Sequence, residues 1–455
     1  MVIVGNGAIG TLTAIDIKST FPKSEVYLVG PAERNFAAST AAGAMANVYA
    51  EMEFSTGQIA QANEIYLEMG KAGSRKWRDF LGSNSGSHCV TSEDTFVYLK
   101  RNATEFETKN FNAATSYALN DKVGALLNKQ HSVTHLPEKL VSSSAEILKI
   151  QGEFSLSVPK LFNYLDILAK NKGVEICDDL ATQINDQGVH LVSGKLIKAD
   201  KIICAAGVKT SNLFPEEYRV LELLQGVGVA MELTIPNSQT SSKLKNGVVR
   251  SVNRGGAQCG IHLVPRNENT FYLGAGNYVS KITQPEIRLD TIRYLLSTFG
   301  NEVVGKDVVY ESVGKFVLGL RPRSIDGFPM IGPLSKNSSI FIITGTNRAG
   351  LTWAPYLSNQ VLNWLKDRDL DGVLSEWKPD RNPIIWGEVC DSIDYFTNSR
   401  ISNAYEHDLF QESLLEEKTI QFRKVAEKLI KTIQEKYHLK ENEVINPDNW
   451  SALTS

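Results

Sequence analysis

The sequence predicts an α/β fold in which a parallel sheet is interrupted by antiparallel segments. A short β-branched strand at Val2–Val4 is followed directly by a G-x-G-x-x-G motif and then by an apolar helical pattern. A second apolar segment, Glu25–Val29, is typical of a neighbouring parallel strand buried on both faces. Residues 226 to 278 instead alternate in polarity, as antiparallel strands with one solvated face do. Together these patterns predict a Rossmann-like domain and a second, antiparallel-sheet domain.

Each glycine of the opening motif has a mechanical role. Gly5 permits the sharp turn, Gly7 lets backbone approach a pyrophosphate, and Gly10 lets the helix pack closely on the strand. Free amides at the helix start, around Ala8 and Ile9, together with the positive end of the helix dipole, suit phosphate oxygens. The motif therefore predicts a dinucleotide site, with a tight turn that binds nothing as the alternative.

Composition excludes several classes of protein. The chain has 455 residues, enough for two interwoven domains, and its 42% hydrophobic and 22% charged residues are ordinary for a soluble protein. A net charge of −3 gives no support for binding nucleic acid or an anionic membrane. No segment is long and apolar enough to span a bilayer, and no basic region precedes the first strand. We therefore expect a cytoplasmic protein.

Neither a disulfide framework nor a metal site is expected. The five cysteines are scattered, odd in number and without a C-x-x-C pair, which is typical of a reducing compartment. His131 and His135 have i, i+4 spacing, but the glutamate of H-E-x-x-H and a third ligand are missing.

The second strand ends atypically. Dinucleotide folds usually place an acid here to bind the ribose, but this chain has Gly30, and Glu33 is the nearest substitute. A run of very small side chains at residues 37–45 follows, where backbone can approach a flat ligand; a tightly packed helix start is the alternative. Within this run we single out Ser39, Thr40, Gly43, Ala44 and Met45.

Further elements follow from apolar periodicity. Helices are expected at Ile59–Leu81, Val158–Lys172 and Pro285–Phe299, and residues 83–148 are expected to be an inserted part of the second domain. The strand within Ala199–Gly207 ends in small residues (Ala205, Ala206 and Gly207), as suits contact with a nucleotide. Cys204 in that strand is interpreted as an inert buried side chain.

Two later segments are more specific. Residues 319–333 (G-L-R-P-R-S-I-D-G-F-P-M-I-G-P) lead into a strand at Ile340–Thr344. The loop after it, G-T-N-R-A-G-L-T-W-A-P at residues 345–355, opens a helix that is expected to reach Leu365. Its free N–H groups suit the electron-rich edge of a bound ring.

In this order, the segments resemble the FAD-dependent amine oxidase family that includes D-amino acid oxidase, glycine oxidase and sarcosine oxidase. The resemblance spans about Met1 to Leu365 and is carried by V-I-V-G-N-G-A-I-G, S-T-A-A-G-A-M, A-D-K-I-I-C-A-A-G, G-L-R-P-R-S-I-D-G-F-P-M-I-G and T-G-T-N-R-A-G-L-T-W-A-P. The last two are the most specific. The chain resembles glycine oxidase in particular, because the pattern of that member also carries an arginine in the final loop, here Arg348.

The resemblance implies a discontinuous FAD-binding domain at residues 1–82, 150–215 and 316–370, and a substrate domain at residues 83–149 and 216–315. FAD is expected to be noncovalent, since no cysteine or histidine stands where sarcosine-oxidase-like members attach it. Motifs and resemblance together assign these residues to the cofactor site: Gly5, Gly7, Ala8, Ile9, Gly10, Glu33, Ser39, Thr40, Gly43, Ala44, Met45, Ala205, Ala206, Gly207, Gly319, Asn347, Arg348, Ala349, Gly350, Leu351 and Thr352.

The same resemblance implies a substrate site. Arg321 of G-L-R-P would pair with a substrate carboxylate through its guanidinium fork, with a structural ion pair as the alternative. Arg348 would touch the substrate or brace its loop, and Arg323 is interpreted as a surface charge. His262 is a candidate for substrate contact, or else an ordinary sheet histidine.

The activity implied is oxidation of the C–N bond of a small amine or amino acid, by hydride transfer to flavin N5 with an imine as product. Oxygen is the expected electron acceptor. Two alternatives remain: a 2-hydroxy-acid dehydrogenase on the same fold, and a flavin-binding complex subunit without turnover.

Residues 371–455 continue past the usual end of the family. An amphipathic helix is expected at about Asp408–Tyr437, and its balanced charges argue against a membrane-surface role. We expect it to pack on its own chain, with a homo-oligomer contact as the alternative. One side of it carries Phe410, Leu414, Phe422, Val425, Leu429 and Ile433.

Overall fold

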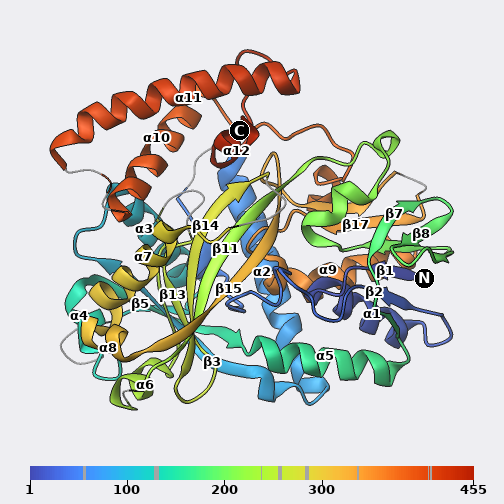
Figure 1. Cartoon of the computed structure of the whole chain (residues 1–455), viewed down its shortest axis with the longest axis horizontal. Helices are drawn as coiled ribbons and strands as arrows, with labels where there is room; N and C mark the ends of the chain where they lie inside the picture. Colours follow the sequence, from blue (N-terminus) through green and yellow to red (C-terminus); the bar gives the residue numbers. More distant parts are fainter. Residues whose placement is uncertain are drawn as a thin grey trace.

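The computed structural model describes residues 1–54, 58–127, 133–236, 238–254, 259–281, 286–335, 338–407, 409 and 412–454. Two large sheets stand side by side, and a helical C-terminal part lies along one edge of both (Figure 1). This arrangement places the carboxyl ends of the first sheet's strands beside the second sheet.

The first sheet has the strand order β16-β17-β10-β1-β2-β6 in the described part of the chain, parallel except for β16. Its strands alternate faces with the period of two that extended chains require. Ile3 therefore packs against helices, whereas Val2 and Val4 pack toward a small three-stranded sheet on the other face. The strands are β1 (Val2–Val4), β2 (Tyr27–Val29), β6 (Glu175–Cys177), β10 (Ile202–Cys204), β16 (Met330–Pro333) and β17 (Ile340–Thr344), and the small sheet is β7 (Ala181–Asn185), β8 (Gly188–Leu191) and β9 (Leu196–Ile197).

Four helices cover the first of these faces and share one hydrophobic core with it. Helix α5 begins with Pro159 in its first turn, where the missing N–H costs nothing, and ends at Gly173, whose φ of 83° is left-handed. The helices are α1 (Ala8–Thr20), α2 (Gln58–Ser83), α5 (Val158–Lys172) and α9 (Gly350–Leu365).

The second sheet has the order β15-β11-β14-β13-β12-β3-β5-β4 among the described residues, and β12–β3 is its parallel pair. The boundaries expected at residues 150 and 316 fall inside its strands β5 and β15. Its strands are β3 (Val90–Lys100), β4 (Gly124–Leu126), β5 (Ser144–Leu156), β11 (Leu223–Thr234), β12 (Val248–Ser251), β13 (His262–Pro265), β14 (Thr270–Ser280) and β15 (Val313–Ser324).

Short helices pack on this sheet. The helix expected at Pro285–Phe299 begins at Leu289 and continues into a π-helical turn at Phe299–Val304, while Pro285 lies outside the described residues. The helices around the second sheet are α3 (Glu105–Asn120), α4 (Glu138–Ser143), α6 (Ser238–Leu244), α7 (Leu289–Thr298) and α8 (Lys306–Glu311).

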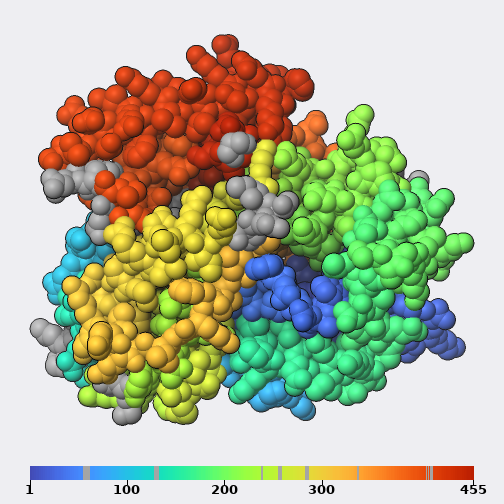
Figure 2. Space-filling view, viewed as in Figure 1, coloured from blue at the N-terminus to red at the C-terminus, as the bar shows by residue number. Residues whose placement is uncertain are grey.

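The C-terminal extension packs on its own chain, as expected. Ile430 and Trp450 of the extension share a buried core with Leu224 and Met330 of the two sheets and with Ile325, which directly follows β15. In Figure 2 the extension, in red, covers one side of the molecule. Its elements are a 3₁₀ turn at Gly372–Glu376, α10 (Val389–Glu406), a 3₁₀ turn at Glu412–Leu414, α11 (Leu415–Tyr437), a 3₁₀ turn at Pro447–Asn449 and α12 (Trp450–Leu453).

Two details of the predicted extension helix were wrong. Helix α11 begins at Leu415 rather than near residue 408, and Asp408 and Phe410 lie outside the described residues. Its buried face is centred on Ala426, Ile430 and Ile433, so Val425 of the expected apolar side is exposed. The face is offset because residues spaced by four and then three, rather than the whole apolar set, meet the core.

Candidate active site

A cavity of about 960 Å³ lies where the two sheets meet. The N-terminal segment, blue in Figure 2, is visible in a recess beside the second sheet. All the residues assigned to the cofactor line this cavity except Gly10 and Thr40. Arg321 and His262 line it too, so segments distant in the sequence converge on one cavity.

The opening turn is shaped by its glycines. Gly5 has a φ of 107°, and a Cβ at Gly10 would overlap the Gly5 carbonyl oxygen, so both positions need glycine. At Gly7 a Cβ would meet only the Ser39 side chain. The Ser39 hydroxyl accepts a hydrogen bond from the Ala8 amide at 3.1 Å, which places the small-residue run against the start of α1.

The atypical end of β2 has a structural reason. An added Cβ at Gly30 would lie 2.5 Å from the side-chain carbonyl of Asn6, so the space for an acid is occupied. Asn6 donates to the Pro31 carbonyl oxygen, and Arg34 donates to the Asn6 carbonyl oxygen at 2.9 Å. Glu33 lines the cavity nearby, where it accepts a hydrogen bond from Asn35.

The loop before α9 forms the opposite wall of the cavity. Asn347 adopts a left-handed φ of 45°, and its amide donates to the Pro322 carbonyl oxygen at 2.8 Å. Thr352 donates to the Met45 carbonyl oxygen at 3.2 Å, which ties α9 to the small-residue run. The first turn of α9 thus faces the cavity with its N-terminal, positive end.

Arg321 stands on β15 with neutral neighbours. Its Nη2 donates to Asn277 Oδ1 at 2.8 Å, and its Nη1 lies 3.1 Å from Cys259 Sγ. The guanidinium lies over Gly228, where a Cβ would be 2.6 Å from Nη2. Sequence reasoning missed Cys259 and Asn277, because neither belongs to a motif.

The thiol of Cys259 is electrostatically unusual. Burial by itself would raise its pKa, but the Arg321 guanidinium and then that of Arg348 lower the pKa below its ordinary value. By contrast, burial raises the pKa of Cys204 to about 12, which agrees with its interpretation as inert.

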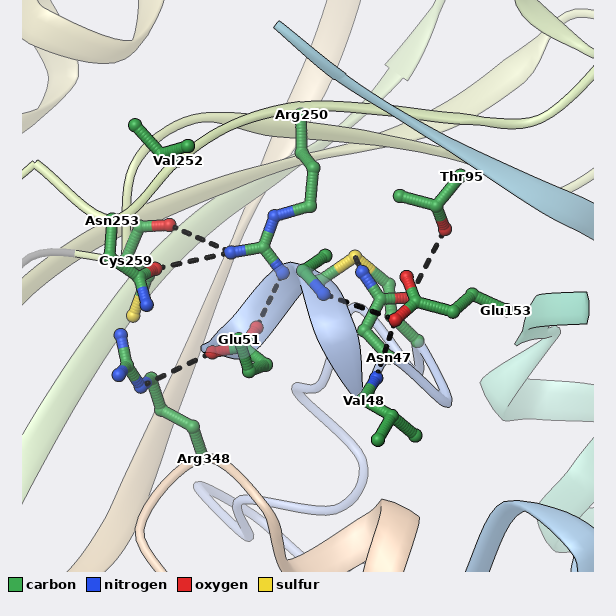
Figure 3. Close-up of polar contacts among 12 residues, drawn as sticks. Asn47, Val48, Glu51, Thr95, Glu153, Arg250, Val252, Asn253, Cys259 and Arg348 are labelled. Atoms are coloured by element: carbon green, nitrogen blue, oxygen red, sulfur yellow. Dashed lines mark hydrogen bonds and ion pairs between the residues drawn. The ribbon is translucent and has the colours of Figure 1, made fainter. Parts of the chain in front are cut away.

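Arg348 is held by two carboxylates, Glu51 and Glu53, of which Glu51 is drawn in Figure 3. Its Nη2 donates to Glu53 Oε1 at 2.8 Å, and its Nε lies 3.7 Å from Glu51 Oε2. Arg250, which is 0% exposed, donates from Nη1 to Glu51 Oε1 at 2.5 Å. Arg348 therefore braces its loop and also lines the cavity, and the loop is tied to β12 through Glu51.

The turn that carries Glu51 rests on a second buried carboxylate. Glu153 Oε1 accepts hydrogen bonds from the amides of Val48, Tyr49 and Ala50 at 2.7, 2.6 and 3.1 Å (Figure 3). Burial raises the pKa of Glu153 to about 7 in spite of these bonds. No sequence motif pointed to Glu51, Glu153 or Arg250.

His262 is buried and stacked on Tyr272, with ring centroids 5.8 Å apart. Burial and then Arg250 lower its pKa to about 3, so the ring is neutral. Its Nδ1 has no hydrogen-bond partner within the described ranges. His135 contacts Phe96, while His131 is not among the described residues.

The prediction for Arg323 was wrong. Instead of a surface charge it is a buried ion pair: Nη2 lies 2.9 Å from Asp448 Oδ2, and the two side chains are 6% and 7% exposed. Its Nε also donates to Asn449 Oδ1 at 2.6 Å. The burial was not predictable because both partners come from the C-terminal extension.

The comparisons with known proteins identify the family. A family model described as FAD dependent oxidoreductase (DAO) matches residues 1–363, and the chain belongs to this family. It is an FAD-dependent enzyme, as predicted. A search of curated proteins found no match. No helix in the described part of the chain is long and apolar enough to cross a membrane.

Solved structures share the fold at low identity. Glycine oxidase from Geobacillus kaustophilus superposes with a TM-score of 0.68 at 17% identity, covering 84% of this chain and 98% of its own. Iminodiacetate oxidase from Chelativorans sp. BNC1 superposes with a TM-score of 0.65 at 15% identity, covering 83% of this chain and 98% of its own. L-proline dehydrogenase from P. horikoshii superposes with a TM-score of 0.64 at 14% identity, covering 84% of this chain and 96% of its own. These likenesses confirm the predicted fold class.

The residues present fit FAD. Gly5 and Gly10 leave no room for side chains at the turn, and the N-terminal ends of α1 and α9 both face the same cavity. That arrangement provides one positive helix end for a diphosphate and another for the electron-rich edge of a ring.

Proposed function

We propose that this oxidoreductase oxidises the C–N bond of a small amino acid or related amine whose carboxylate binds Arg321. The observation that carries the proposal concerns charge. Three arginines line the cavity: Arg34 pairs with Asp166 and Arg348 with Glu53, whereas Arg321 has no carboxylate partner among the described residues. An unpaired guanidinium beside a neutral amide is suited to an incoming carboxylate.

Different residues around the cavity have different roles in this proposal. Arg321 fixes the carboxylate and therefore the position of the adjacent carbon. A bound FAD would supply the hydride acceptor for that carbon, and water would hydrolyse the imine product. The N-terminal amides of α9 at Gly350, Leu351 and Thr352 would hold negative charge on the ring edge. His262 is neutral and serves as a wall and a substrate contact, so no protein base is assigned to the carbon-bound hydrogen.

Finer features belong to the same proposal. We propose that FAD is held noncovalently by the residues named above, that oxygen reoxidises it, and that the chain divides into the FAD-binding, substrate and extension segments drawn from its sequence. A cytoplasmic location is supported by the cysteines, all of which are free. A homo-oligomer contact through the extension is supported by the exposed apolar side chains of Ile420 and Val425.

The test begins with purified protein. A flavin absorption spectrum should be present, and an anaerobic panel of amino acids should bleach it, with peroxide formed once air is admitted. Bleaching by 2-hydroxy acids with electrons passed only to a dye would instead assign the dehydrogenase. A yellow protein that no amine or hydroxy acid bleaches would refute the proposal in favour of a flavin-binding subunit.

A further inference from the structure

Glu51 lines the cavity, and one of its carboxylate oxygens, Oε2, receives no hydrogen bond from the described residues. Its Oε1 receives the Arg250 hydrogen bond at 2.5 Å, but Oε2 has only Arg348 Nε at 3.7 Å, beyond hydrogen-bond distance. The side chain lines the cavity and is 27% exposed. Within the described ranges, Oε2 is therefore an acceptor with spare capacity on the substrate side.

The oxygen carries a stable negative charge. Burial would raise the pKa of Glu51, but Arg250 and Arg348 together lower it to about 2. Glu51 is consequently ionised at any ordinary pH and is too weak a base to remove a proton. What it offers a ligand is an anionic hydrogen-bond acceptor.

Glu51 also lies near the proposed carboxylate anchor. The Sγ atom of Cys259 is 3.1 Å from Arg321 Nη1. The charges of Arg321, Arg348 and Glu51 all affect the pKa of this thiol. In the close-up, Cys259 lies directly above the Arg348 guanidinium, with Glu51 beside it (Figure 3). Among the described residues, a guanidinium without a carboxylate partner and a carboxylate oxygen without a hydrogen-bond donor thus line the same cavity.

We propose that Glu51 Oε2 accepts a hydrogen bond from the substrate's amino group while Arg321 binds the substrate's carboxylate; this inference rests on the proposed function. Glu51 thereby selects amino acids over 2-hydroxy acids. The two groups match the two opposite charges that an amino acid carries on one carbon. A hydroxyl can donate to the same oxygen, but without the charge that makes such a bond strong.

This contact has a consequence for pH. Hydride loss needs a neutral amine, so the ammonium group must first release a proton to water. An anion beside the ammonium stabilises it and raises the amine's pKa in the complex. Turnover of the wild type should therefore rise at a higher pH than turnover of a variant in which Glu51 is neutral.

The experiment uses the holoenzyme and two probes that differ only in the group of interest: 2-aminoisobutyrate and 2-hydroxyisobutyrate. Neither carries a hydrogen on the carbon beside its carboxylate, so neither can lose a hydride there. Perturbation of the flavin spectrum reports binding. The wild type should bind the amino probe about 10- to 100-fold more tightly, the range of one charge-assisted hydrogen bond.

The variants are Glu51→Gln and, as the matched control, Glu53→Gln. The Glu53→Gln variant also loses a negative charge beside Arg348, but Glu53 does not line the cavity. Glu51→Gln should remove the preference for the amino probe, and Glu53→Gln should keep it. Glu51→Asp retains the anion, so it should keep part of the preference even if Glu51→Gln fails to fold around Arg250.

Three results would overturn the inference: no amino preference in the wild type, a preference that survives in Glu51→Gln, or equal losses in the Glu51 and Glu53 variants. If Glu51→Gln cannot be folded, loss of the whole preference in Glu51→Asp alone would overturn it as well. If amino acids bleach the flavin but the preference is independent of Glu51, the inference fails while the proposed function stands. A wild type that is bleached by no amino acid and binds neither probe refutes both.

Discussion

Replacing Asp448 with asparagine isolates the ion pair by which the C-terminal extension holds strand β15. Asp448 and Arg323 are 2.9 Å apart and nearly fully buried, so the variant leaves a buried guanidinium without its counter-charge. Breaking such a pair from one side costs about 3–5 kcal/mol. Asparagine keeps the volume, and Asn449 Oδ1 still accepts from Arg323, so we expect a loss of about 2–4 kcal/mol in unfolding free energy.

The assay is urea unfolding followed by tryptophan fluorescence, to which the buried Trp450 of the extension contributes. The matched control is Asp394→Asn, which breaks the exposed pair between α10 and Arg423 of α11 and should cost below about 1 kcal/mol. If Asp448→Asn costs no more than this control, the extension is not held by its buried charge and the reasoning is refuted.

Three further predictions concern the cavity and its supports. Arg321→Ala should lower kcat/KM for carboxylate substrates about 100-fold or more while the flavin spectrum is retained, and unchanged kinetics would show that the anchor is misassigned. Gly10→Ala should weaken FAD binding about 10-fold or more, because the new Cβ overlaps the Gly5 carbonyl oxygen; the fluorescence of released flavin measures this loss. In the control, Gly82→Ala, the new Cβ meets nothing within 4 Å, so this variant should bind FAD as the wild type does. In the folded protein the pKa of Glu153 is raised from 4.5 to about 7, so the free energy of unfolding of the wild type should fall as pH rises from about 4.5 through 7. Glu153→Gln should remove about 1–3 kcal/mol of that pH dependence. Parallel curves of stability against pH for the two proteins would contradict this prediction.

The first half of the site was predictable because its determinants are local. The turn from β1 into α1 is specified by ten consecutive residues, and the loop before α9 by a similar number. Strand and helix periods were likewise visible, so β17, α5 and α9 match their expected bounds. Gly30 shows the limit: its meaning depends on Asn6, which fills the space beside it.

The substrate side was not predictable, because its charges are paired across the whole chain. Glu51 and Arg250 are 199 residues apart, and Arg321 and Cys259 are 62 apart. A sequence shows that arginines and glutamates are present, but not which of them neutralise one another. Burial of Arg323 was missed for the same reason, since its partners lie 125 and 126 residues away.

Pairing also decides which arginine is available to a ligand. Arg321 and Arg323 are two residues apart on β15 and therefore project from the same face of the strand. Asp448 of the extension neutralises Arg323, and Glu53 neutralises Arg348, whereas Arg321 is left with an amide and a thiol. Without Asp448, the guanidinium of Arg323 would lose its carboxylate partner as well. In the described part of the chain, Asp448 of the extension therefore leaves Arg321 as the guanidinium of β15 without a carboxylate partner, although no described residue of the extension lines the cavity.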